Sequence, residues 1–253
     1  DSGDENSAMV LMAKGASKMA AQLHHTGRID GLLVLGGTMG TDLALDVASS
    51  LPVGVPKVVM STVAFSPLLP HDRLPPDLMM VLWAGGLYGL NSLCQSALAQ
   101  AAGAVVGACR VARAPRFERP VVGMTSLGSS CLKYMVQLQP ELLQRGFDLA
   151  VFHTTGMGGR AFESLAARGQ FACVMDFSLQ EVVNQMGGSV VNAGPERLMG
   201  AGLNGVPMIV APGATDLVDY PAWGQMPERF AGRPSHEHNR LIASVGIDAN
   251  MRR

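Results

Sequence analysis

The densest group of side chains able to do chemistry is the run His236, Glu237, His238 and Asn239. Two imidazoles beside a carboxylate can act as general acid or base, hold a metal ion or donate to a phosphate. Two histidines one residue apart suit a metal ion when the backbone is extended, but the HExxH spacing is absent and the sequence marks no third ligand. We expect an active-site role, with metal ligation and an incidental surface cluster as the alternatives.

Three segments combine glycine with hydroxyl side chains just after short apolar runs. They contain Gly36, Gly37, Thr38, Gly40 and Thr41; then Thr125, Gly128 and Ser129; then His153, Thr155, Gly156, Gly158, Gly159 and Arg160. Glycines allow close approach of a ligand, helix N-termini attract anions, and arginine binds phosphate bidentately. Together the loops predict an anionic small molecule, with a nucleotide as first choice. Glycine turns that serve only packing are the alternative.

These loops do not match the best-known nucleotide motifs. The first lacks the lysine of a Walker A loop, and none has GxGxxG spacing. Asp46 lies too close to the first loop to be the ribose-binding acid of a dinucleotide fold. Hydride chemistry is therefore not supported.

Three carboxylates also follow apolar runs. Asp176 ends one run, Glu181 opens the next helical segment, and Asp216 follows residues 209–215. Carboxylates at strand ends can bind ribose, Mg²⁺ or an ammonium group. Asp216 can instead cap the turn that follows it.

The elements that position these residues follow from periodicity. An amphipathic helix from Met9 to Leu23 leads into the uniform apolar run 30–35. Further strand-like runs at 57–61, 121–125, 149–153, 172–176 and 207–211 mostly alternate with helical segments such as 131–145 and 159–168. This alternation predicts an α/β protein with parallel sheets flanked by helices.

Composition divides the chain and limits its functions. Residues 110–120 are charged and proline-bearing, as an interdomain linker is, so we expect domains at 1–115 and 116–253. The uncharged stretch from Leu78 to Cys109 is long enough for a membrane span, but its polar positions favour a deeply buried helix. A net charge of −1 does not favour nucleic acid. Four scattered cysteines and an acidic, polar beginning indicate a cytoplasmic protein.

Five ordered motifs resemble the Tm-1-like (UPF0261) family. They are residues 31–38, residues 51–64, residues 152–161, residues 207–216 and residues 235–239. The resemblance implies two Rossmann-like subdomains, ATP as ligand, homodimers and a protein partner. It also implies that this chain is shortened at both ends. Mg²⁺, which the strand-end carboxylates can bind, is the ion expected with ATP.

The resemblance favours a site in the second half. The family's matching positions there are kept, including Glu163, Asp176, Glu181, Gly213 and Asp216. In the first half Met39 stands where a small residue is usual, and Gly86 and Gln95 replace an acidic and a basic residue. The first site is therefore expected to be altered.

Three hypotheses result from the sequence. The first is a nucleotide (ATP)-binding protein whose phosphates lie at the glycine loops, with the His236 cluster facing a cleft between the domains. The second is a noncatalytic interaction module controlled by nucleotide. The third is a hydrolase or ligase of a small acid, with His236, His238 or His153 as acid–base group and Asp216 or Glu237 orienting it or holding Mg²⁺.

Overall fold

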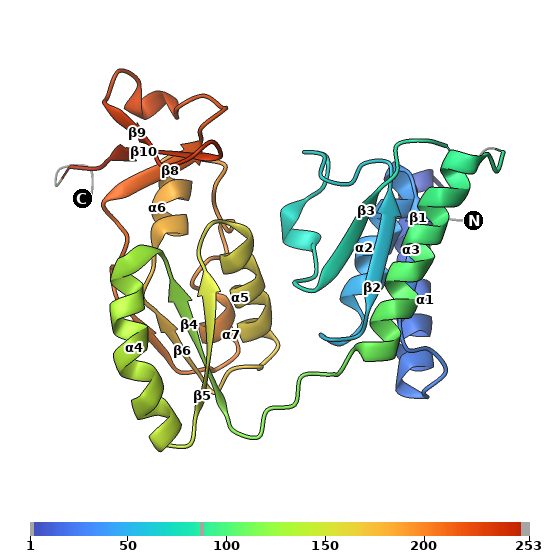
Figure 1. Cartoon of the computed structure of the whole chain (residues 1–253), viewed down its shortest axis with the longest axis horizontal. Coiled ribbons are helices and arrows are strands. Elements are labelled where there is room, and N and C mark those ends of the chain that lie inside the picture. The colour runs from blue at the N-terminus through green and yellow to red at the C-terminus, as the bar shows by residue number, and fades with distance from the viewer. Residues whose placement is uncertain (1–2, 87–88, 249–253) are drawn as a thin grey trace. The chain divides into compact units, whose positions relative to one another are not determined.

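The computed structural model describes residues 3–86 and 89–248, which form two compact units (Figure 1). Unit 1 comprises Asp1–Arg116 and unit 2 comprises Phe117–Arg253. Each has its own parallel sheet flanked by helices, so the predicted α/β class is confirmed.

Unit 1 is a three-stranded parallel sheet in the order β1-β2-β3. Its elements are α1 (Glu5–His25), β1 (Leu32–Gly36), α2 (Thr38–Ser49), β2 (Lys57–Ser61), η1 (His71–Arg73), β3 (Leu78–Leu82) and α3 (Ser92–Val111). Leu32 packs with α1 and α2, whereas its neighbour Leu33 packs with α3. Because neighbouring strand residues point to opposite faces, the helices cover both faces of the sheet.

The stretch predicted as one buried helix has a different structure. Residues 78–82 form the strand β3, and the helix that follows, α3, is mostly exposed. Only Cys94, Ala97 and Ala101 of α3 are buried, because one sheet face can cover only one stripe of a helix. By length and composition α3 is the one helix of the described residues apolar enough to cross a membrane, and 17% of that apolar window is buried.

Unit 2 contains a four-stranded parallel sheet in the order β5-β4-β6-β7. Its parallel strands and helices are β4 (Val121–Ser126), α4 (Gly128–Gln144), β5 (Asp148–His153), α5 (Met157–Ala167), β6 (Cys173–Asp176), α6 (Gln180–Met186), α7 (Gly200–Leu203) and β7 (Met208–Val210). Helix α4 lies on one face of this sheet, and α5 with α7 lies on the other (Figure 1). Phe162 of α5 packs with Phe152 and Phe171 in an aromatic core, with ring centroids 5.5–5.7 Å apart.

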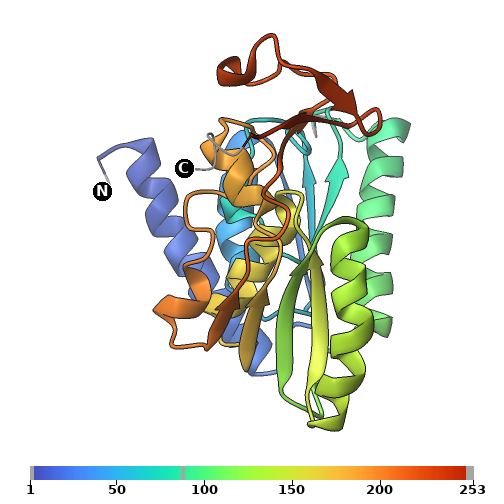
Figure 2. The ribbon, with the colours of Figure 1, turned by 90° about the vertical axis from the view of Figure 1, so that its left-hand side faces the viewer.

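A second, antiparallel sheet completes unit 2. Its strands are β8 (Leu217–Pro221), β9 (Ser235–Glu237) and β10 (Ile242–Gly246), in the order β8-β10-β9, with η2 (Glu228–Phe230) between β8 and β9. This sheet lies beyond the carboxyl ends of β4–β7, next to α6 (Figures 1 and 2). These strands were not predicted, because they are short and separated by Pro- and Gly-rich turns.

Candidate functional site

The three helices that start at the predicted glycine loops have no side-chain cap. Their N-cap residues are Gly37 for α2, Leu127 for α4 and Gly156 for α5. By contrast, Asp4 and Asn91 cap α1 and α3 with their side chains. The predicted glycine loops therefore lie at helix N-termini. Because these helix starts are uncapped, their backbone N–H groups are left for another acceptor.

The glycine loop before α5 is already filled in part by a carboxylate of the same unit. Glu181 Oε1 accepts hydrogen bonds from the N–H groups of Gly156 and Gly159, at 2.6 and 3.0 Å. A Cβ atom on Gly159 would lie 1.7 Å from Glu181 Oε2, so only glycine fits there. Gly156 also has a φ of 99°, which glycine adopts most readily. Two of the amides predicted to bind phosphate therefore bind Glu181.

Glu181 belongs to a buried cluster around Arg197. Arg197 Nε donates to Glu181 Oε2 at 3.0 Å, and its Nη1 donates to Glu163 Oε1 at 2.9 Å and to Asp176 Oδ2. Burial raises the pKa of Glu181, even though Arg197 and the two amides oppose it. Burial disfavours the charged form of Arg197 as well, but Asp176 and Glu181 outweigh this and raise its pKa. One cation thus holds three carboxylates together.

Thr125 and Asp176 serve this cluster. The Thr125 hydroxyl is fully buried, donates to Asp176 Oδ1 at 2.7 Å and accepts from the N–H groups of Phe177 and Ser178. Arg197 Nη2 also donates to Asp176 Oδ1, at 2.9 Å. Both carboxylate oxygens of Asp176 therefore have partners inside unit 2. Arg197 was absent from the sequence-based site, since nothing local marks it.

Other groups at the start of α5 remain open. Among the described residues, the N–H groups of Met157 and Gly158 have no hydrogen-bond partner. His153, the last residue of β5, and Thr155, in the loop that follows, are both exposed. A Cβ atom on Gly158 would lie 1.7 Å from the His153 carbonyl oxygen, so this glycine is required by the turn itself.

Arg160 lies in the first turn of α5 and is half-buried. Its Nη2 donates to the Asn192 carbonyl oxygen at 3.4 Å, while its Nε is buried with no partner in the described part of the chain. Within residues 3–86 and 89–248 no carboxylate pairs with it. A half-buried guanidinium without a counter-ion, in the same helix turn as two open amides, can bind an anion.

The other two predicted loops are less enclosed. Gly128 and Ser129 are exposed at the start of α4. In unit 1, Thr41 is buried and its hydroxyl bonds to the Gly37 carbonyl oxygen and to Ser61 Oγ, both at 2.6 Å. Gly36 and Gly37 border a cavity of about 240 Å³, which Trp83 also lines. The Trp83 Nε1 atom is buried with no partner among the described residues.

The histidine cluster lies on the antiparallel sheet of unit 2. Ser235–Glu237 form β9, and His236, Glu237, His238 and Asn239 are all exposed. The backbone is extended there, as an HxH metal site would require, but the described residues contain no group of three or more His, Cys, Asp or Glu side chains placed to hold a metal ion.

A buried carboxylate in the same antiparallel sheet was not predicted. Asp219 on β8 and His236 on β9 are both register partners of Ser244 on β10. Ser244 Oγ donates to Asp219 Oδ1 at 2.5 Å. Burial raises the pKa of Asp219; its Ser244 bond and the charge of His238 oppose the rise, and Asp216 adds to it. Asp216 itself is exposed.

The fold and these loops define a class: an α/β protein of two Rossmann-like units with uncapped, glycine-rich helix starts at the strand ends. The family models agree in both units. The N-terminal domain of the uncharacterised protein family UPF0261 matches residues 1–114, and its C-terminal domain matches residues 119–252. The chain belongs to the UPF0261 family, which confirms the resemblance seen in its motifs.

Individual relatives give the same assignment. A UPF0261 protein of Brucella suis is 58% identical over all of this chain and 60% of its own length. A UPF0261 protein of Clostridium tetani is 35% identical over 94% of this chain and 59% of its own length. The ToMV resistance protein Tm-1(GCR237) of Solanum lycopersicum is 28% identical over 93% of this chain and 32% of its own length. The chain thus spans about 60% of the length of the bacterial relatives named.

Proposed function

We propose that this chain binds a nucleotide, ATP with Mg²⁺, and that the phosphates lie at the start of α5. The observation that carries the proposal is Arg160, a half-buried cation with an unpartnered Nε and no carboxylate partner among the described residues. Met157 and Gly158 are the first two residues of the same helix, and within the described part of the chain their N–H groups are free to donate to a ligand. Guanidinium and helix amides together are a common way to bind phosphate.

Glu181 determines which backbone N–H groups of this loop are available to a phosphate. Its carboxylate binds Gly156 and Gly159, so these amides are unavailable to phosphate while it stays in place. The phosphates would then contact the outer donors: Arg160, the amides of Met157 and Gly158, and the exposed side chains of His153 and Thr155. The buried cluster below would hold the loop rigid, which reduces the entropy lost on binding.

The proposal is tested by calorimetric titration of the 253-residue chain with ATP in the presence of Mg²⁺. We expect Arg160→Ala to weaken ATP binding by about tenfold or more, because a charge-assisted bidentate contact contributes roughly 1.5–3 kcal/mol. The matched control is Arg145→Ala. It removes an exposed arginine that pairs with Glu141 at the C-terminal end of α4.

Three results would contradict this placement. Equal ATP affinity in Arg160→Ala and the unchanged chain would remove α5 from the phosphate site. Equal weakening in the Arg145→Ala control would show a general effect of charge. Absence of binding at millimolar ATP would reject nucleotide binding by this chain.

A further inference from the structure

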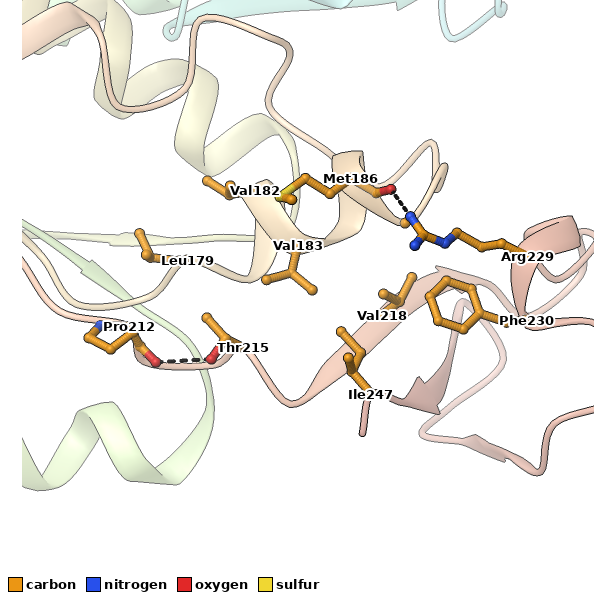
Figure 3. A pocket seen from close by; sticks show the side chains of 11 residues that line it. Leu179, Val182, Val183, Met186, Pro212, Thr215, Val218, Arg229, Phe230 and Ile247 are labelled. Carbon is orange, nitrogen blue, oxygen red and sulfur yellow. Dashed lines mark hydrogen bonds between the residues drawn. The ribbon is translucent and has the colours of Figure 1, made fainter. Parts of the chain in front are cut away.

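A second cavity, this one in unit 2, lies between α6 and the antiparallel sheet and has a volume of about 570 Å³ (Figure 3). Small-molecule sites generally occupy roughly 300–1,000 Å³, so the size suits a metabolite. Apolar side chains from five parts of the chain form most of its wall. They are Leu179, Val182, Val183 and Met186 around α6, Pro212 after β7, Val218 on β8, and Phe230 with Ile247 beside the sheet.

The charge in the wall of this cavity is positive and comes from Arg229. Of the residues that the structure describes, Arg229 is the one charged residue in the wall, and none of the described aspartates or glutamates lines it. Arg229 Nη1 donates to the Met186 carbonyl oxygen at the end of α6, and the guanidinium lies 5.5 Å from the Phe230 ring centroid. Among the described residues Arg229 has no carboxylate partner, so most of its five N–H donors are available. Figure 3 shows the guanidinium at one side of the cavity, beside Met186.

An apolar wall with a single cation at its side selects a ligand with an apolar body and an anionic head. Burial of the body is favoured by the hydrophobic effect, while the guanidinium can bind a carboxylate. The Thr215 hydroxyl, which donates to the Pro212 carbonyl oxygen at 3.1 Å, adds a second polar group to the wall. We propose that this cavity binds a small monocarboxylate with an apolar chain or ring, at a site separate from the proposed nucleotide site.

The test uses octanoate as the probe, with octan-1-ol as its uncharged counterpart. Calorimetry on the 253-residue chain should show saturable octanoate binding, weakened about tenfold by Arg229→Gln because one charged contact is lost. Glutamine removes the charge and keeps a side-chain N–H donor at this position. Octanol should bind equally to the unchanged chain and to Arg229→Gln.

The matched control is Arg233→Gln, which removes the same charge four residues away, where Arg233 pairs with Asp248. Octanoate affinity should be unchanged in this variant. Methyl NMR supplies an independent readout: the signals of Val182, Val183 and Ile247 should shift on titration with octanoate. ATP affinity should be the same in Arg229→Gln, so the two proposals can fail separately.

Three outcomes would overturn the proposal. One is no saturable octanoate binding at millimolar concentration. Another is equal loss of octanoate affinity in Arg229→Gln and Arg233→Gln. The last is a set of methyl shifts confined to residues outside the cavity.

Discussion

Replacement of Arg197 by methionine is expected to destabilise unit 2 by about 3–5 kcal/mol, because it leaves buried carboxylates without their cation. Arg197 is 5% exposed, and its partners Asp176 and Glu181 are fully buried. Neither carboxylate can turn to water. Urea unfolding measures the loss, with hydrogen exchange of the β4 and β6 amides reporting on unit 2 itself.

The pH dependence of the Arg197→Met variant gives a second check. Burial already raises the pKa of Glu181 above its ordinary value of 4.5, and the loss of Arg197 removes an opposing effect. A carboxyl group whose pKa is higher in the folded state binds more protons there, so its contribution to stability is present at low pH and is lost as pH rises. The penalty of Arg197→Met should therefore be smallest in acid and grow as pH rises above 4.5.

The control is Arg145→Met, whose side chain is 63% exposed and pairs with Glu141. Exposed ion pairs contribute about 0–1 kcal/mol, so this variant should unfold almost as the unchanged chain does. If Arg197→Met cost no more than Arg145→Met at neutral pH, the buried cluster would not hold unit 2 together.

Replacement of Gly159 by alanine is expected to cost about 3 kcal/mol, the second large effect. The new Cβ atom would lie 1.7 Å from Glu181 Oε2 and 2.4 Å from Glu181 Cδ. The collision must displace a buried carboxylate that bonds to Arg197 and to two loop amides. Overpacking alone costs roughly 1–3 kcal/mol, and a disturbed buried ion pair adds to this. Urea unfolding again measures the change.

Two comparisons isolate the cause of this effect. Gly202 in α7 has open space around its Cα, so Gly202→Ala should leave stability unchanged or raise it by up to about 1 kcal/mol. In a Glu181→Ala background, Gly159→Ala should cost much less, because the colliding carboxylate is gone. Purely additive losses in the double variant would show that Glu181 is not what requires glycine at this position.

Local sequence patterns predicted the frame of the molecule well. The apolar runs at 57–61 and 121–125 correspond closely to β2 and β4, and the first helix ends before Gly27, which has a φ of 67°. The glycine loops were correctly located at strand ends. These features depend on residues close together in the chain, which periodicity and turn chemistry describe directly.

The sequence patterns failed where the structure depends on contacts between segments that are far apart in the chain. Strand β3 and the exposed surface of α3 could not be separated from a buried helix, since hydropathy does not say which neighbour covers a segment. The antiparallel sheet that carries His236 was missed for a related reason: a three-residue strand such as β9 is defined by its partner β10.

The sequence by itself determined the α/β class, the family and the positions of the glycine-rich helix starts. Only the tertiary structure decided what those glycines contact: Glu181 reaches Gly156 across 25 residues, and Arg197 reaches Glu163 across 34. It likewise joined Asp219 to Ser244 and placed Arg229 beside an apolar cavity. The interaction energy between two charged groups is larger when both are buried away from water. Folding decides which groups are buried together, because it brings them from distant parts of the chain.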